Sequence, residues 1–416
     1  MKKDKEFRAD VAIVGGGVAG LAAAVAAARA GAGVCLVENN GFLGGIATAG
    51  LVGRFQEGPY VKGSPVIRGL YREICQRLQG YDALRGELFD PESMKYVAFD
   101  LCEEAGVKLL LHSKAYEADV QSGYVEGFYI ATKQGSHKVR ARVYVDATGD
   151  GTLSALAGAR FKVGRQTDGL QQPMTLVFQL GNVETDRLKT ADWEELSAKF
   201  REEVKGLSSR SRIFYFEFTE GLLGFVMTHV VGLNPLDVED LTRAEIESRR
   251  HVLQIQKFFR GNVPGCERCV IATSPVEIGI RESRRIVGDY ILTREDVLGA
   301  RKFEDSICCS TSWIDIHNPD GVGVLHELTI PDDWFEVPLR AVVVKGFDNL
   351  LVAGRCMSAT HEAQGAIREI PTCIAVGQGA GVAAAIAARK RRVHARMVDV
   401  RVLQRELLDQ GVNLRQ

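Results

Sequence analysis

The spacing of apolar residues over the first forty positions predicts a strand, a helix and a second strand. Asp10-Val-Ala-Ile-Val14 is an apolar run with the length of a buried strand. The alanine-rich segment from about Ala19 to Ala30 has the composition of a buried helix. Val34-Cys-Leu-Val37 is a second apolar run, and Glu38 follows it directly. Elements in this order predict two parallel strands joined by a crossover helix.

Residues 90–145 predict a further strand of this sheet and a separate antiparallel meander. Asp90-Pro-Glu has the N-cap residue, the N1 proline and the early acid of a helix start, and Gly106 ends that helix. Val107–Leu111 is then a buried strand, which we expect to be the third strand of the sheet. From about 115 to 145 three runs alternate polar and apolar residues, and the last of them is Lys138–Val145.

The pattern changes from about Phe161 to Pro331, where strand-like runs surround a polar helix. Buried strands return near Val337. A chain of 416 residues is too long for one ordinary core, so two domains are expected. We predict an α/β fold in which residues 1–160 and 335–416 form one discontinuous domain. Residues 161–334 form an inserted mixed α+β domain that carries specificity.

A glycine turn joins the first predicted strand to its helix. Gly15 allows the tight turn, Gly17 lets a phosphate approach the backbone, and Gly20 lets helix and strand pack closely. Phosphates would lie at the positive end of the helix that starts near Ala19. Glu38 lies 23 residues after Gly15, where a carboxylate can accept hydrogen bonds from a ribose. The turn therefore predicts a Rossmann-type dinucleotide site, and a turn that packs but binds nothing is the alternative.

Three further segments place glycine after a predicted strand, at the edge where such a sheet binds its ligand. They are Gly41–Gly50, Asp146–Asp150 and Val352–Ala363. After the last one, Pro371 begins a helix with glycine at 377, 379 and 381. We expect these glycines to pack closely against the cofactor or the first helix, and a helix packed for stability alone is the alternative. The residues expected to contact a cofactor are Gly15, Gly17, Val18, Ala19, Gly20, Glu38, Asn39, Gly44, Gly45, Thr48, Ala115, Thr148, Gly149, Asp150, Gly354, Arg355, Thr372 and Cys373.

The composition excludes several classes of partner. The formal net charge is −1, so no basic surface for nucleic acid or an anionic membrane is expected. No uninterrupted apolar run reaches the roughly 18 residues that span a bilayer. The charged start Met-Lys-Lys-Asp-Lys-Glu does not resemble a signal peptide. We therefore expect a cytoplasmic protein.

The nine cysteines are scattered and odd in number, which is typical of free thiols. Cys266 and Cys269 form the one C-x-x-C spacing. A zinc site would need a second pair of ligands nearby, so no metal is expected. The pair is either a redox dithiol that exchanges with a cofactor or two thiols at a junction between loop and strand.

Taken together, these glycine-rich segments resemble those of the FAD-dependent oxidoreductases. Residues 281–290, 349–363 and 371–381 resemble a bacterial family of flavoproteins distantly related to fumarate reductase flavoproteins. The resemblance implies FAD in a glutathione-reductase-like fold, with FAD on the discontinuous domain and substrate on the inserted one. Two positions depart from the family pattern: His229 stands where an arginine is expected, and Cys266 where an aromatic residue is expected.

In such an enzyme the flavin performs the hydride chemistry and the protein handles the proton. His361 follows a strand end expected beside the flavin, so it is the first candidate, and packing of the loop is its alternative. Arg281 could clamp a substrate carboxylate or act as an acid, as the fumarate reductase relatives suggest. A buried ion pair that joins the domains is the alternative for the arginines around Glu282. His317 lies in a loop that could cover the site.

We predict an FAD-dependent oxidoreductase that transfers a hydride between a small polar metabolite and flavin N5, as a dehydrogenase or a C=C reductase. The alternatives are a thiol/disulfide oxidoreductase that uses Cys266 and Cys269, and a flavoprotein electron-transfer subunit. No second G-x-G-x-x-G follows a strand, so a dedicated nicotinamide domain is not expected. Electrons would come from the substrate, from an external carrier protein or from a nicotinamide that visits the site.

Overall fold

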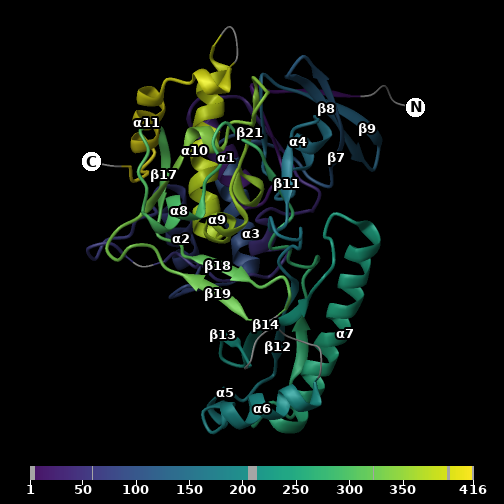
Figure 1. The fold of residues 1–416 in the computed structure, drawn as a ribbon. Helices are drawn as coiled ribbons and strands as arrows, with labels where there is room; N and C mark the ends of the chain where they lie inside the picture. Colours follow the sequence, from purple (N-terminus) through teal and green to yellow (C-terminus); the bar gives the residue numbers. More distant parts are fainter. Residues whose placement is uncertain (1–4, 59, 205–212, 322, 391–393, 415–416) are drawn as a thin grey trace.

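The computed structural model describes residues 5–58, 60–204, 213–321, 323–390 and 394–414. It is a mixed α/β fold built on a five-stranded sheet in which all neighbouring strands are parallel (Figure 1). The strand order is β21-β10-β2-β3-β6. The bounds are Leu350–Val352 for β21, Val143–Asp146 for β10, Val11–Val14 for β2, Val34–Val37 for β3 and Lys108–Leu110 for β6. The predicted parallel unit and its third strand are thus confirmed.

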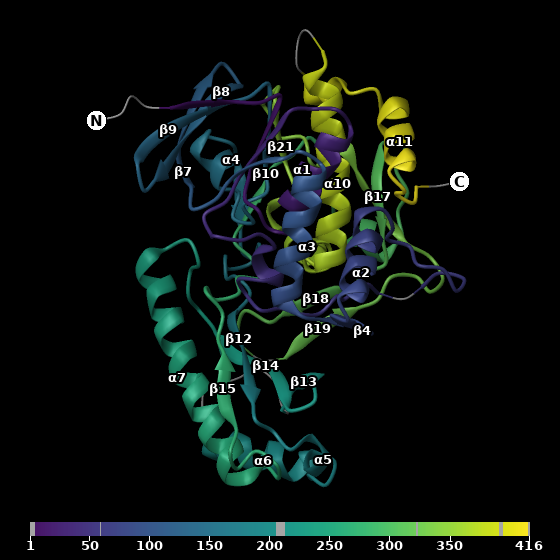
Figure 2. The ribbon, with the colours of Figure 1, turned by 180° about the vertical axis from the view of Figure 1, so that it is seen from behind.

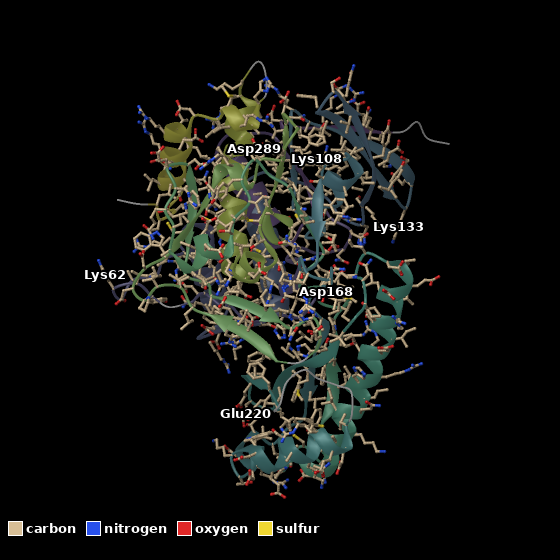
Figure 3. All side chains as sticks on the ribbon, viewed as in Figure 1. Lys62, Lys108, Lys133, Asp168, Glu220 and Asp289 are labelled. Atoms are coloured by element: carbon tan, nitrogen blue, oxygen red, sulfur yellow. The ribbon has the colours of Figure 1, made fainter. Side chains whose placement is uncertain are left out.

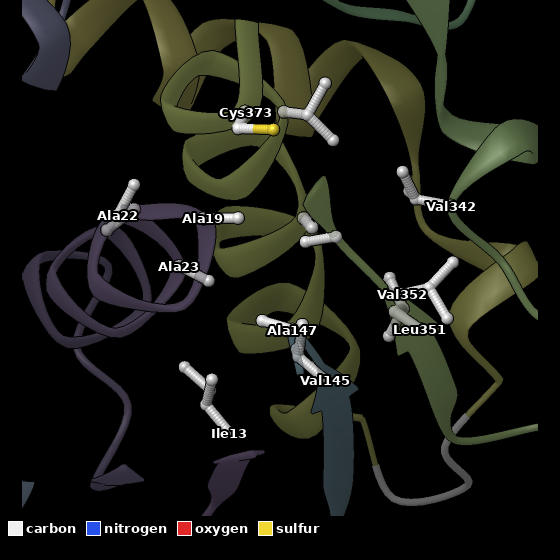
Figure 4. Close-up of a cluster of buried hydrophobic side chains, with 14 of the residues drawn as sticks. Ile13, Ala19, Ala22, Ala23, Val145, Ala147, Val342, Leu351, Val352 and Cys373 are labelled. Carbon is white, nitrogen blue, oxygen red and sulfur yellow. The ribbon is translucent and has the colours of Figure 1, made fainter. Parts of the chain in front are cut away.

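Helices and a second sheet cover the two faces of this sheet. Helix α1 (Val18–Arg29) and helix α10 (Ile370–Ala388) lie side by side on one face, where Val145 of β10 contacts their cluster (Figures 2 and 4). Neighbouring side chains of a strand point to opposite faces, so Tyr144 points away from these helices. Its ring packs against Phe128 of the meander, with ring centroids 6.0 Å apart. Coverage of both faces explains why the central strands β10, β2 and β3 are buried at every position.

The antiparallel meander consists of β7 (Lys114–Gln121), β8 (Tyr124–Thr132) and β9 (Gly135–Arg140). The prediction that its last strand runs from Lys138 to Val145 is wrong, because β9 ends at Arg140 and β10 belongs to the parallel sheet. The Ala141 amide donates to the Tyr144 hydroxyl at 2.8 Å instead of continuing the ladder. This local hydrogen bond turns the chain from one sheet into the other.

A second group of elements extends from the main body (Figure 1). It holds an antiparallel sheet of order β13-β14-β12-β15, with bounds Tyr215–Thr219, Leu222–Val230, Met174–Gly181 and Val270–Thr273. The long helix α7 (Val238–Asn262) packs on it, and Asp237 caps its first turn. The buried side chains here form a hydrophobic cluster separate from that of the main body.

The members of this second cluster lie between Met174 and Ile278, inside the predicted insertion, and the domain boundaries themselves stay a prediction. Asp168, labelled in Figure 3, pairs with Arg165, which also reaches Asp320 of the main body at 2.8 Å.

Helix α1 contacts helix α10 through glycines of α10, without large side chains between them. A Cβ built on Gly377 would lie 2.2 Å from the carbonyl oxygen of Ala19, and one on Gly381 would lie 2.2 Å from that of Ala23. The predicted glycine-spaced helix is therefore packed against the first helix. By length and composition α10 could cross a membrane, but its apolar window is completely buried, as in a core helix. The sequence criterion missed it because threonine, glutamine and glycine interrupt its apolar run.

We expect Gly381→Ala to lower the free energy of unfolding by about 1–3 kcal/mol, because the methyl group overpacks the contact with Ala23. Gly261→Ala is the matched control, since Gly261 is also helical and nothing lies within 4 Å of its built Cβ. There the gain in helix propensity should raise stability by up to about 1 kcal/mol. Urea unfolding of both variants measures the difference, and equal effects would contradict the proposed helix contact.

Candidate active site

A cavity of about 1270 Å³ lies at the carboxyl-terminal edge of the parallel sheet. Residues that follow each of its five strands line this cavity: Gly15 after β2, Glu38 after β3, Ser113 after β6, Ala147 after β10 and Gly354 after β21. An open α/β sheet binds ligands at this edge. Pockets for a single small ligand usually measure roughly 300–1,000 Å³, so there is room for more than one small molecule.

Gly17 and Gly20 differ in what surrounds them. A Cβ on Gly17 would meet only the Cα of Gly45, at 3.9 Å, and both residues line the cavity. A Cβ on Gly20 would lie 1.8 Å from the carbonyl oxygen of Gly15, and Gly20 is not among the lining residues. Gly17 therefore leaves space on the ligand side at the start of α1, whereas Gly20 permits the turn to pack against the helix.

Glu38 lies at the edge of the cavity and is buried. One carboxylate oxygen accepts a hydrogen bond from the Gly16 amide at 2.6 Å, and the other accepts one from the Asn40 amide at 2.7 Å. Burial raises the pKa of Glu38, although these amides oppose the shift. The Asn39 amide and the Asn40 side chain supply further hydrogen bonds to this carboxylate at the edge of the cavity.

The second glycine turn packs directly on the first, since the Gly44 amide donates to the Gly16 carbonyl at 2.8 Å. Gly45 and Asn39 line the cavity, but Gly44 and Thr48 do not. The Thr48 hydroxyl donates to the Leu43 carbonyl at 2.7 Å. Thr48 therefore closes the turn and does not point toward a ligand, contrary to the sequence prediction.

The segment after β10 is held by a fully buried carboxylate. Asp146 accepts hydrogen bonds from the Thr148 hydroxyl at 2.7 Å and from the Ser154 amide at 2.7 Å. Asp150 in turn accepts from Arg355 at 2.8 Å and from the Ser283 hydroxyl at 2.6 Å. The predicted cofactor contacts Val18, Ala19, Ala115, Thr148, Gly149, Asp150, Gly354 and Arg355 all line the cavity.

Of the two cofactor contacts predicted at the start of α10, only one lines the cavity. Cys373 lines the cavity, but its amide already donates to the Glu369 carbonyl at 2.8 Å. Thr372 does not line it, and the Thr372 hydroxyl bonds to those of Ser310 and Ser312 at 2.8 and 2.9 Å. The cavity-facing polar groups at this helix start are Arg368 and Glu369, which the sequence analysis did not assign to the cofactor site.

His361 is not among the lining residues and is buried at the start of α9 (His361–Ile367). Its Nδ1 lies 2.9 Å from Oε1 of Glu282, and Arg285 pairs with the same oxygen. Glu282 and Arg285 thus form the buried ion pair that was the structural alternative for these residues. These contacts favour the packing alternative for His361, which stays a prediction as a catalytic residue.

Arg281 and His317 line the cavity and meet through His229. Arg281 donates to the Thr175 hydroxyl at 2.5 Å and approaches His229 Nε2 at 3.4 Å. His229 Nε2 lies 3.1 Å from His317 Nδ1, and the two rings are stacked. Burial and the nearby Arg281 lower the pKa of His317 to about 3, so the imidazole is neutral at neutral pH. His229, which was expected to depart from the family pattern, therefore contacts two residues that line the cavity.

Asp315 joins His317 to the start of α10. It pairs with Arg368 at 2.6 Å and with His326 at 2.7 Å. Burial opposes ionisation of Asp315, but hydrogen bonds from both histidines and the charge of Arg368 outweigh it and hold its pKa well below the usual range. Glu369 lies beside Arg368, with 3.4 Å between the charged groups, yet burial raises the pKa of Glu369 to about 7. We name Arg281, His229, His317, Asp315, Arg368 and Glu369 the polar cluster.

The position of Glu369 on the cavity and the ion pairs of Asp315 were not predicted from the sequence. The signal in the sequence was the Arg368-Glu369 pair directly before an otherwise apolar helix.

Cys266 and Cys269 are both buried and neither lines the cavity, which favours two structural thiols over exchange with a cofactor there. Among the described residues, no group of three histidine, cysteine, aspartate or glutamate side chains is arranged to hold a metal ion.

Comparison with known proteins identifies relatives of this architecture. A family model described as FAD dependent oxidoreductase matches residues 10–407. A comparison with curated proteins finds no match. Among solved structures, a geranylgeranyl bacteriochlorophyll reductase-like protein from Thermoplasma acidophilum is 13% identical, with a TM-score of 0.51 over 98% of this chain and 84% of that one.

Two further solved structures are similar over most of their length. The p-nitrophenol 4-monooxygenase from Pseudomonas putida is 13% identical over 97% of this chain and 84% of that one, with a TM-score of 0.44. A myxobacterial chondrochloren halogenase is 12% identical over 96% and 78%, with a TM-score of 0.46. At such identities a likeness concerns the fold alone.

Replacement of Glu369 by glutamine should change how stability depends on pH. An unfolded glutamate titrates near pH 4.3, while the folded pKa of Glu369 is raised to about 7. The stabilisation by the protonated carboxyl is therefore complete below about pH 4.3 and is lost as pH rises through about 7. Because glutamine does not ionise, Glu369→Gln should gain stability relative to the parent protein between about pH 5 and about pH 8.

Urea unfolding at a series of pH values measures this gain, with the exposed Glu304→Gln as the control. A difference between Glu369→Gln and the parent that does not vary with pH would show that Glu369 is not a buried carboxyl of raised pKa.

Proposed function

The chain belongs to the FAD dependent oxidoreductase family, and from this premise we propose a glutathione-reductase-like flavoenzyme that transfers a hydride between a small molecule and flavin N5. The observation that carries the proposal is one continuous cavity that joins the carboxyl edge of the sheet to the polar cluster. When bound, FAD supplies the hydride chemistry, and the protein supplies orientation and proton transfer.

The residues at the sheet edge fit the ADP half of FAD. The open side of Gly17 at the start of α1 suits a diphosphate, because free amides and the helix dipole favour negative charge there. The carboxylate of Glu38 at the edge of the cavity suits ribose hydroxyls, with Asn39 beside it. Ala115 would border the adenine, and Arg355, fixed by Asp150, would border the middle of the cofactor.

The cavity lining suggests that one part of the chain holds FAD and the other holds the substrate. Residues 1–160 and 335–416 would hold FAD, and residues 161–334 would hold the substrate. In support, Thr175 and Val177 of β12 and Ile278 line the cavity and belong to the second group of elements, and Arg281 and His317 follow them in the chain. The substrate would thus reach the flavin where the two parts meet.

Glu369 is our first candidate for proton transfer. With a pKa of about 7 it is half protonated at neutral pH, which suits a group that either donates or accepts a proton. Oxidation of an alcohol or amine carbon would use its ionised form, and reduction of a C=C bond its protonated form. Arg281, held by Thr175 and the Pro173 carbonyl, would orient the substrate, and the neutral His317 would accept or donate a hydrogen bond.

The proposal is tested by anaerobic mixing of the FAD-loaded protein with a panel of small metabolites while the flavin absorbance is followed. We expect at least one small molecule to bleach or restore this absorbance at a catalytic rate. In Glu369→Gln the ionisation near pH 7 should disappear from the pH profile of that rate. If only a partner protein exchanges electrons with the flavin, the chain is an electron-transfer subunit and the proposal is wrong.

Substitution of Gly17 tests the cofactor site separately. Gly17→Ala should leave the stability of the FAD-free protein unchanged, because its methyl group meets only Gly45, yet weaken FAD binding by about tenfold or more. Gly20→Ala is the matched comparison and should destabilise the fold itself, since its methyl group would overlap the Gly15 carbonyl. Fluorescence titration with FAD and urea unfolding measure the two effects. Unchanged FAD affinity in Gly17→Ala would contradict diphosphate binding at this turn.

A further inference from the structure

The antiparallel sheet of the second group of elements has two apolar faces. Successive side chains of a strand point to opposite faces of a sheet. On one face Phe225 stacks on Phe178, with ring centroids 5.1 Å apart, and its ring centroid lies 6.2 Å from that of Tyr215. These three side chains belong to, or pack against, the hydrophobic cluster that holds the buried apolar side chains of α7. The face toward α7 is therefore an ordinary core face.

The other face borders the cavity. Five apolar side chains from β12, from β14 and from the segment that runs into β13 line it: Val177, Val226, Phe214, Phe216 and Phe218. The ring centroids of Phe214 and Phe216 are 4.9 Å apart and those of Phe216 and Phe218 are 6.4 Å apart, both edge to face. Val177, Phe216 and Phe218 belong to none of the hydrophobic clusters that the described residues form. We call the five residues the apolar face.

The apolar face is held by contacts from both parts of the chain. Phe216 pairs with Gly224 of β14 in the sheet. A Cβ on Gly224 would lie 2.2 Å from the Phe218 ring, and one on Gly53 of the main body would lie 2.7 Å from the same ring. The guanidinium of Arg54, also from the main body, lies 5.3 Å from the ring centroid of Phe216. The phenylalanine rings are thus fixed at the border of the cavity.

Apolar side chains on the second face of such a sheet are unusual. An antiparallel sheet commonly packs one face on a core and turns polar side chains outward on the other. Elsewhere the cavity is lined by charged groups of both signs, among them Glu38, Asp150, Glu277, Arg281, Arg355 and Arg368. The charges therefore do not select the sign of a ligand. The apolar face is the part of the lining that distinguishes one class of ligand from another.

We propose that the substrate carries an apolar body at least as large as a phenyl ring and that this body lies on the apolar face. This inference rests on the proposed function and narrows its substrate class to hydrophobic alcohols, amines or alkenes, in place of polyols and other small polar metabolites. A polar molecule would leave the apolar face in contact with water, whereas an apolar body removes both its own surface and that face from water. The cavity of about 1270 Å³ has room for such a body as well as for a cofactor.

Equilibrium binding of uncharged probes to the FAD-loaded protein tests the inference without turnover. Benzyl alcohol and cyclohexylmethanol carry an apolar ring, whereas glycerol and ethylene glycol do not. Perturbation of the flavin spectrum and calorimetry would give the four affinities. We expect each ring-bearing probe to bind at least about tenfold more tightly than either polyol, because only the rings bury the apolar face. A preference of less than tenfold for either ring-bearing probe overturns the inference.

Two variants locate the preference. Phe216 lies on an edge strand and is half-buried, and Phe216→Ser should reduce the preference for benzyl alcohol over glycerol to about threefold or less. Val226→Thr adds a hydroxyl to the apolar face and should also lower the preference. Tyr96→Ser changes an exposed aromatic residue on α3 (Pro91–Glu104) and is the control that should keep it.

The same variants identify a different occupant of the apolar face. A preference that survives both Phe216→Ser and Val226→Thr would place the apolar body elsewhere and overturn the inference. If Phe216→Ser weakens the binding of FAD itself and leaves the preference unchanged, the flavin covers this face and the inference is wrong.

The outcomes separate this inference from the proposed function. If glycerol or another polyol binds best and also bleaches the flavin, the function stands and the substrate class is wrong. If the ring-bearing probes bind as expected but no small molecule exchanges electrons with the flavin, the proposed function fails and the apolar binding site stands.

Discussion

The contact between α1 and α10 is the constraint on which the site depends. Gly377 meets Ala19 and Gly381 meets Ala23, so the two helices run parallel with matched spacing. Helix α1 begins one residue before Ala19, whereas α10 begins seven residues before Gly377. At 1.5 Å per residue, the start of α10 therefore reaches about 9 Å further along the helix direction. Two positive helix ends thus lie at different positions along one cavity, the first at the proposed diphosphate site and the second at the polar cluster.

The same packing explains the electrostatics of the polar cluster. Because α10 is buried along its whole length, the residues at its start are taken out of water together with it. Burial raises the pKa of Glu369 to about 7, although the charge of Arg368 beside it acts in the opposite direction. Asp315 is buried as well, yet it remains ionised because it has Arg368 and two histidines as partners. Two neighbouring buried carboxyl groups thus behave in opposite ways, because Asp315 is ionised whereas the pKa of Glu369 is raised.

The sequence predicted best what adjacent residues determine. The glycine turn, the Asp90 cap and the apolar strand runs depend on local geometry, and the structure contains all of them. Contacts between residues that lie far apart in the sequence were predicted poorly. The Thr48 hydroxyl turns inward because a carbonyl lies within reach, and His361 is held by Glu282, 79 positions away. His229 was noticed only as a departure from a family pattern, and its contact with His317 spans 88 positions. The alternation of Phe214, Phe216 and Phe218 was visible, but no local rule says which face of a strand meets a cavity.

We propose that one cavity holds FAD along the sheet edge and presents the flavin ring to the polar cluster. A crystal structure of the FAD-loaded protein would decide where the cofactor binds. We expect the diphosphate at Gly17, a ribose on Glu38 and the flavin ring at the end of the cavity that Arg281, His317 and Glu369 line. A flavin ring located away from this cluster, or FAD bound outside the cavity, would contradict it.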